Sequence, residues 1–280
     1  MSLDAETENE LNELAKAIRL YDLKMSFGAG KNGSHLGGSL SAAEIMAVLY
    51  GRVMRFDPKA PDSPDRDRFI LSKGHTAAVL YAALRAVGVL TDEDIATYNK
   101  NGTELPSHCI KNPAKGIELS SGSLGLGAGY AAGLGLALKK QNNPAHIYVL
   151  LGDGECAEGS VWEALCAIPA LKLTNITVII DKNRLQLDGR TDIVFDTGIL
   201  SAKLEAFGWD VKCVYGHDVN TLAEALTPES APLRPRAVVA FTVKGKGVSF
   251  MEDNYRFHHA SLTEEQYNAA VAEITGEAQA

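Results

Sequence analysis

The sequence lacks several features that define whole classes of proteins. Its four cysteines form no CxxC pair, so they indicate neither a disulfide framework nor a zinc site, and we expect reduced thiols. No apolar run approaches the roughly 18 residues that a membrane-spanning helix needs. Residues 1–6 are acidic and do not resemble a signal peptide. The net charge of −8 argues against nucleic acids and anionic membranes as partners. Together these absences predict a cytoplasmic protein.

Apolar residues, in contrast, are abundant and are arranged for an α/β core. They make up 46% of the 280 positions, which is enough for one large domain or two small ones. In the second half of the chain, short apolar runs alternate with helical periodicity, which predicts a doubly wound, mainly parallel sheet with helices on both faces. With no linker apparent, we expect residues 1–280 to form a single domain. The predicted strands are 146–151, 176–181, 210–215 and 236–243, and the predicted helices are 159–171, 199–207, 219–227 and 263–276.

The N-terminal part, about residues 1–120, is expected to be richer in loops. Residues 32–39 are predicted to form a Gly-rich loop that carries His35. Ser41 is predicted to cap a helix, with Glu44 completing a capping box. The other elements expected here are helices at 7–27, 42–53, 76–87 and about 92–100, a strand at 68–71 and an irregular segment at 105–119.

The most specific feature is a pair of polar residues at the ends of two predicted strands. Asp153, in a Gly-Asp-Gly turn, follows one strand, and Asn183, 30 positions later, follows the next. Ligands of open α/β sheets bind outside the carboxyl ends of the strands. Oxygens from Asp153 and Asn183, with the Leu185 carbonyl as a third donor, suit Mg²⁺ or Ca²⁺ completed by diphosphate oxygens. The alternative is a simple turn with Asn183 as a local cap.

Two glycine-rich segments bear on the kind of ligand. Gly152 and Gly154 let the backbone approach a bulky anion, and a helix expected to begin at Glu155 would present amides that favour a phosphate. Residues 120–138 carry six glycines but follow no convincing strand and do not match GxGxxG, which argues against a dinucleotide site. A helix in the second half of this segment is expected to pack against another subunit.

This arrangement resembles the diphosphate-binding motif of thiamine diphosphate enzymes. Six blocks in a fixed order narrow the resemblance to the transketolase family, and they extend over about residues 10–265. The blocks are KNGSH (31–35), LSKGH (71–75), LPSH (105–108), GSLG (122–125), GDGECAEG (152–159) and DKNRL (181–185).

The resemblance implies which residues hold thiamine diphosphate and its metal. Asp153, Asn183 and the Leu185 carbonyl would bind Mg²⁺ or Ca²⁺, and Asn183 would also contact the cofactor. The other implied cofactor contacts are His75 at the diphosphate, the backbone of Gly122, Ser123 and Leu124, Gly154, and His258.

The resemblance also implies a catalytic set made largely of histidines. His35, His108 and His258 would face the reactive carbon and the sugar hydroxyls, because proton transfer at neutral pH favours imidazole. Glu158 would reach a subunit interface near the cofactor. His259 is an alternative to His258, since the family usually has glycine after this histidine. The remaining histidines, His146 and His217, fit none of the blocks and are expected to be structural or surface residues, while Lys244 and Lys246 are expected to attract sugar phosphate.

A carboxylic acid that activates the cofactor's aminopyrimidine is missing from the matched blocks. In the transketolase family it comes from a second, pyrimidine-binding domain. We therefore expect the N-terminal subunit of a split transketolase, self-associating and working with a separate C-terminal subunit in a heterotetramer. The expected reaction transfers a two-carbon ketol unit from a ketose phosphate to an aldose phosphate. The alternatives are another thiamine diphosphate reaction, such as 1-deoxyxylulose-phosphate synthesis, or a non-catalytic half that binds cofactor or partner.

Overall fold

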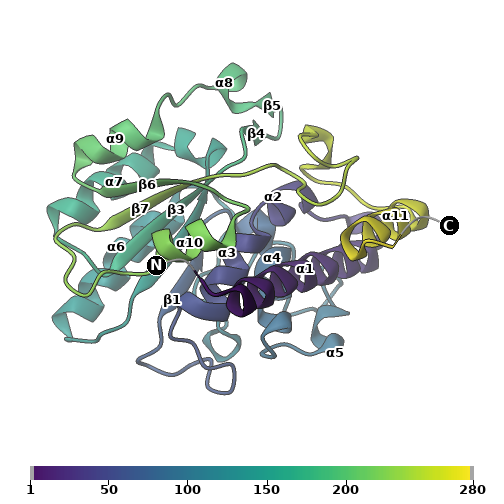
Figure 1. Cartoon of the computed structure of the whole chain (residues 1–280), viewed down its shortest axis with the longest axis horizontal. Helices are drawn as coiled ribbons and strands as arrows, with labels where there is room; N and C mark the ends of the chain where they lie inside the picture. The colour runs from purple at the N-terminus through teal and green to yellow at the C-terminus, as the bar shows by residue number, and fades with distance from the viewer. Residues whose placement is uncertain (1–2, 278–280) are drawn as a thin grey trace.

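The computed structural model describes residues 3–277 and is built on a five-stranded parallel sheet (Figure 1). The continuous apolar runs of the sequence become its strands, and the predicted doubly wound fold is confirmed. In spatial order the strands are β1 (Arg68–Leu71), β2 (Ile147–Gly152), β3 (Ile176–Lys182), β7 (Arg236–Phe241) and β6 (Asp210–Tyr215).

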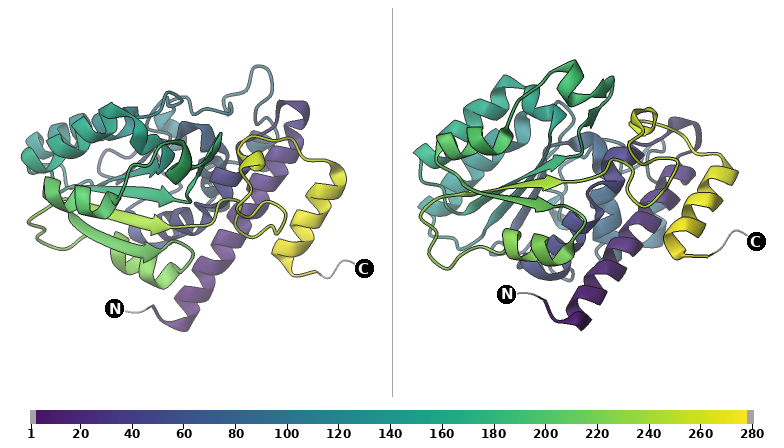
Figure 2. Two further views of the ribbon diagram at one scale, coloured as in Figure 1. Left: turned by 90° about the horizontal axis from the view of Figure 1, so that it is seen from above. Right: turned by 45° about the horizontal axis from the view of Figure 1, so that its top comes forward.

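Helices cover both faces of the sheet because alternate strand residues are apolar on both sides (Figure 2). Tyr148 and Leu150 of β2 face one helical layer, whereas Val149 and Leu151 face the other. The first layer contains α1 (Ala5–Gly28), α3 (Ala43–Val48), α4 (Ala77–Ala86) and α10 (Val219–Leu226), and the second contains α6 (Leu126–Lys140), α7 (Gly159–Ala170) and α9 (Leu200–Phe207).

The central strands are buried on both faces, as is expected of a doubly covered parallel sheet. Every residue of β2 is buried except Gly152, and every residue of β3 except Lys182. The edge strand β6 has no fully buried residue. All five strands are parallel, so their carboxyl ends lie together on one side of the molecule, where ligands of such sheets bind.

A smaller helical unit extends beyond the carboxyl ends of the strands. Phe27 of α1 stacks on Tyr267 of α11 (Glu264–Thr275) with ring centroids 4.5 Å apart. Figure 1 shows α1 and α11 side by side, and the chain between β7 and α11 crosses the strand ends. Three further α-helices are short, namely α2 (Leu36–Leu40), α5 (Asp92–Ile95) and α8 (Thr191–Val194), and β4 (Leu185–Gln186) and β5 (Gly189–Arg190) form a hairpin.

Several local predictions were wrong in the N-terminal part. Ser41 does not cap a helix, because its hydroxyl bonds Asp181, 140 positions away, while Glu44 pairs with Arg19. The helix expected at 42–53 is α3 followed by a π-helical turn at Leu49–Val53. The expected loop at 32–39 contains α2, and the helix expected at 92–100 ends at Ile95. Long-range contacts decide these segments more than local propensity does.

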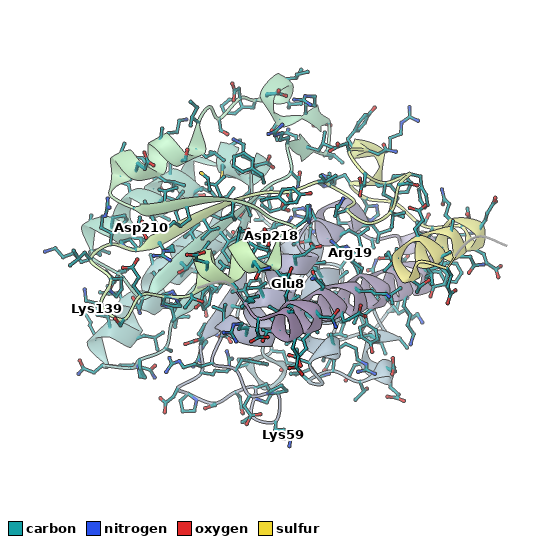
Figure 3. The ribbon with its side chains drawn as sticks, viewed as in Figure 1. Glu8, Arg19, Lys59, Lys139, Asp210 and Asp218 are labelled. Atoms are coloured by element: carbon teal, nitrogen blue, oxygen red, sulfur yellow. The ribbon has the colours of Figure 1, made fainter. Side chains whose placement is uncertain are left out.

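Within residues 3–277, every helix is too short or too polar to cross a membrane. Charged side chains such as Lys59 and Lys139 lie at the periphery in the view of Figure 3, whereas Arg19 lies within the outline of the molecule. Arg19 is buried because it forms a salt bridge with Glu44 and donates to the Lys246 carbonyl, so its charge is matched inside the fold.

A buried acid in α1 makes stability depend on pH. Asp22 is 1% exposed and accepts a long hydrogen bond of 3.3 Å from Ser26, and burial raises its pKa to about 8. The unfolded chain releases this proton near its ordinary pKa of about 3.9, so the native state holds an extra proton between about pH 4 and pH 8. Stability therefore falls as pH rises through this window.

We predict that Asp22→Asn removes this loss. Asparagine carries no titrating charge, so the variant should gain on the order of a few kcal/mol relative to the unaltered chain between about pH 5 and pH 8. Urea unfolding of both proteins across this range provides the measurement. If the free energy of unfolding of the two proteins depended on pH in the same way, the assignment of this pH dependence to Asp22 would be contradicted.

Candidate active site

The Gly-Asp-Gly turn lies where two neighbouring strands end together. Gly152 pairs in register with Asp181, and the Asp153 amide donates to the Asp181 carbonyl at 3.2 Å. The buried carboxylate of Asp153 accepts from the amides of Gly154 at 2.9 Å and Arg184 at 2.7 Å. Burial and the neighbouring Asp181 raise the pKa of Asp153 to about 6. A cation at this position would stabilise the ionised carboxylate.

Asn183 and Leu185 lie beside Asp153, as the spacing predicted. Asn183 is buried, its Oδ1 accepts from the Leu185 amide at 3.1 Å, and its Nδ2 donates to Asp181 at 3.0 Å. The Leu185 carbonyl accepts from the Lys244 ammonium at 2.9 Å. Across residues 3–277, no cluster of three His, Cys, Asp or Glu side chains could hold a metal ion. The predicted donor set offers only one carboxylate, so any metal here would depend on oxygens of a bound anion.

Asp181 organises the carboxyl ends of the strands, although the sequence analysis gave this first residue of the DKNRL block no role. Its fully buried carboxylate accepts from Lys73 Nζ at 2.5 Å, Ser41 Oγ at 2.7 Å, Asn183 Nδ2 and Thr242 Oγ1. Burial alone would raise its pKa, but the Lys73 ammonium and these donors hold the pKa below its ordinary value. A charged residue at the end of an otherwise apolar run was the available signal.

Two buried lysines bring positive charge to a cavity that carboxylates also line. Lys73 and Lys244 are each 2% exposed, and both line the cavity at the strand ends. Burial and the charge of Lys73 lower the pKa of Lys244 to about 8. Lys73 is paired with Asp181, whereas among the described residues Lys244 bonds only the Leu185 carbonyl and His258, so the Lys244 ammonium favours an anionic ligand.

The cavity measures about 430 Å³ and contains most of the predicted residues. Gly154 forms part of its wall, where a Cβ would lie 3.1 Å from Gln186, so a side chain at this position would crowd the wall. The predicted residues His35, His108 and Ser123 do not line it. Those that do are His75, Gly122, Leu124, Asp153, Gly154, Glu158, Asn183, Leu185 and His258.

Five histidine rings gather at one side of the cavity. His35 is at the centre, with ring centroids 5.2 Å from His75, 5.5 Å from both His108 and His258, and 4.6 Å from His259. Burial and the neighbouring imidazoles, His259 first, lower the pKa of His35 to about 3. Burial also lowers the pKa values of His75 and His108. These rings are therefore neutral near pH 7, and each keeps one ring nitrogen that can accept a hydrogen bond.

His258 has a defined tautomer because of its lysine partner. The Lys244 ammonium lies 2.9 Å from His258 Nδ1 and has no acceptor of its own, so Nδ1 accepts and the ring proton is on Nε2. Burial and Lys244 lower the pKa of His258 to about 3. His258 stacks on His75 with centroids 5.3 Å apart, whereas His259 is exposed and does not line the cavity.

His146 and His217, which were expected to be structural or surface residues, do not line the cavity. His146 Nε2 lies 2.8 Å from the Thr177 hydroxyl, and His217 bridges Glu44 and the Val243 amide. The cysteines are free, as expected, with Cys109 and Cys156 buried.

Comparison with known proteins decides the family. Residues 11–277 match the family model described as the transketolase thiamine diphosphate binding domain. The chain belongs to the transketolase family. A 6-deoxy-6-sulfo-D-fructose transketolase subunit from Clostridium sp. (strain MSTE9) is 40% identical, covering 98% of this chain and 99% of that protein. An apulose-4-phosphate transketolase subunit from Actinobacillus succinogenes is 39% identical, covering 96% of this chain and 97% of that protein.

Larger transketolases correspond to this chain over part of their length. Human transketolase is 35% identical over 99% of this chain and 44% of its own length. The transketolase from Leishmania mexicana has the same fold, with a TM-score of 0.87 at 31% identity over 95% of this chain and 41% of that one. The chain is therefore a transketolase subunit with the thiamine diphosphate-binding fold, and the prediction of an N-terminal subunit of a split transketolase is confirmed.

We predict that Asp181→Asn destabilises the transketolase subunit by roughly 3–5 kcal/mol, because it leaves the Lys73 ammonium buried without its partner. Urea unfolding gives the value. Asp210→Asn, in the partly exposed pair with Arg236, is the control and should cost about 1 kcal/mol or less. Adding Lys73→Met to Asp181→Asn should recover stability. Equal destabilisation by Asp181→Asn and Asp210→Asn would contradict the role of Asp181.

Proposed function

We propose that this transketolase subunit binds thiamine diphosphate in the cavity at the strand ends and, with a partner subunit, transfers a two-carbon ketol unit from a ketose phosphate to an aldose phosphate. The observation that carries the proposal is the convergence of Asp153, Asn183, two buried lysines and neutral histidines on one cavity. The full-length match to proteins named as transketolase subunits supports it.

The donors around the cavity suit the cofactor's charged end. Asp153, Asn183 and the Leu185 carbonyl would hold Mg²⁺ or Ca²⁺, and the raised pKa of Asp153 supports a cation there. The cofactor would be contacted by His75, Gly122, Ser123, Leu124, Gly154, Asn183 and His258. When bound, thiamine diphosphate supplies the electron sink that lets a carbon–carbon bond beside a carbonyl break and form.

The histidines would handle the protons of the sugar hydroxyls. His35, His108 and His258 have pKa values below that of free imidazole, so each is neutral near pH 7 and keeps one ring nitrogen that can accept a hydrogen bond from a sugar hydroxyl. His258 is favoured over His259 because it lines the cavity and bonds Lys244. Glu158 lines the cavity at an exposed position and would contact another subunit.

The partner subunit would close the cavity and supply the missing acid. Large apolar side chains are exposed from β4 to the start of α9, including Ile193 at 78% and Phe195 at 60%. Leu187 and Phe195 also line the cavity, so this apolar segment joins the cavity to a surface that a partner can cover. An assembly of two copies of each chain would follow.

The donor sugar is expected to belong to the class named for the relatives. One relative is named for a 6-deoxy-6-sulfo sugar and another for apulose 4-phosphate. Both names describe a sugar that carries an anionic group, a sulfonate in one and a phosphate in the other. We propose a ketose with such a group as donor, which the names of both relatives support.

We predict that Asp153→Ala weakens Mg²⁺-dependent thiamine diphosphate binding by more than about 100-fold, because it removes the only carboxylate of the proposed metal site. Titration calorimetry with cofactor and Mg²⁺ measures this. Asp92→Ala, in a surface ion pair with Arg85, is the control and should bind normally. Normal affinity of the Asp153 variant would contradict the ligand assignment.

We predict that the purified chain alone shows essentially no ketol transfer and that the co-purified partner restores turnover. Ile193→Asp should weaken partner binding at least about tenfold, since it places a charge in an apolar contact. Leu233→Asp, 95% exposed before β7, is the matched control and should leave binding unchanged. Analytical ultracentrifugation measures the complex. Strong activity of the chain alone would overturn the need for a partner.

A further inference from the structure

We infer that Glu155 is a positioning residue of the cofactor cavity, whose buried carboxylate holds three separate chain segments of the cavity wall in register. The inference rests on the proposed binding of thiamine diphosphate for its functional meaning. Glu155 lies in the cavity wall, but its carboxylate bonds two backbone amides and a hydroxyl and none of the proposed metal ligands. Its role is to fix the backbone that carries the contacts.

The carboxylate of Glu155 accepts hydrogen bonds from two backbone amides and a hydroxyl. The residue is 2% exposed. Its Oε1 accepts from the Gly125 amide at 2.8 Å and from Ser72 Oγ, and its Oε2 accepts from the Gly152 amide at 3.1 Å. A buried carboxylate is costly unless such donors surround it, so this contact set is a fixed feature of the fold.

Each donor stands next to residues of the cavity wall. Ser72 follows β1 and precedes Lys73, which lines the cavity. Gly152 ends β2 and precedes Asp153. Gly125 follows Leu124 of the cavity wall and is the N-cap of α6. A single carboxylate therefore joins the ends of two strands to the start of a helix.

Close backbone packing makes this junction rigid. The Gly127 amide donates to Ser72 Oγ at 3.1 Å, and a Cβ at Gly127 would lie 2.4 Å from the Ser72 Cβ. Gly125 has φ of +83°, and a Cβ there would lie 2.4 Å from Ser160 Oγ. The segments approach one another more closely than side chains would allow. A small shift of one segment would therefore displace the neighbouring residues Leu124 and Asp153.

A neutral isostere tests the carboxylate without removing its volume. Glutamine has one acceptor oxygen and one donor group where glutamate has two acceptors. In Glu155→Gln, whichever way the amide is turned, at least one of the amides of Gly125 and Gly152 loses its acceptor. The cavity wall should then loosen locally while the fold persists.

Asp67 provides a closely matched control at the amino ends of the strands of the same sheet. Its carboxylate is 3% exposed, and it precedes β1. One oxygen accepts from Arg55 Nη2 and the His146 amide, and the other accepts from the Arg55 amide, each at 2.8 Å. Asp67→Asn therefore disturbs the same pattern of bonds away from the cavity.

The experiment measures amide hydrogen exchange of the full chain without cofactor, and then cofactor affinity of the two-subunit enzyme by titration calorimetry. We expect Glu155→Gln to speed exchange in peptides covering residues 121–128 at least about tenfold, and to weaken cofactor binding at least about tenfold. Asp67→Asn should speed exchange near Arg55 and His146 and leave cofactor affinity within about twofold of normal.

The outcomes separate the two proposals. Unchanged exchange at residues 121–128 in Glu155→Gln would overturn the inference, as would equal losses of cofactor affinity in the two variants. Faster exchange there with a selective loss of affinity would support it. Failure of the unaltered enzyme to bind thiamine diphosphate would overturn the proposed function and with it the functional role of Glu155, while exchange alone would still report whether the junction exists.

Discussion

The buried ion pair between Asp181 and Lys73 is the interaction on which the rest of the site depends. It joins the ends of β3 and β1, two strands separated by β2. Through Ser41 and Thr242 the same carboxylate also fixes the entry to α3 and the segment after β7. Because both charges are almost fully buried, each is tolerable only in the presence of the other. The cavity is therefore built around a buried ion pair, and removing either partner would destabilise the fold.

A second network fixes the segment that follows β7. His217 accepts from the Val243 amide through Nε2, so its Nδ1 donates to Glu44, which in turn pairs with Arg19. Lys244 comes next in the chain and reaches Leu185 and His258. The order of contacts thus leads from the centre of α1 to the histidines of the cavity. Residues far from any ligand determine where the Lys244 ammonium lies.

The fold could be predicted from sequence far better than the internal contacts of the site. The strands were found because β2 and β3 are continuous apolar runs, and Asp153 and Asn183 were found because each follows one of them. Ser41 was misassigned because its partner is 140 positions away. Family blocks located His35, His75 and His108, but no pattern in the sequence indicated that His258 and Lys244 share a hydrogen bond.

The wall formed by Leu187 and Phe195 has a thermodynamic consequence. These side chains line the cavity and also belong to the exposed apolar segment proposed to meet the partner. If one wall serves both ligands, their binding free energies are coupled, and the coupling is reciprocal. Whatever factor the partner adds to cofactor affinity, the cofactor must add to partner affinity. Assembly of the two chains would then respond to the supply of vitamin-derived cofactor, without any separate regulatory site.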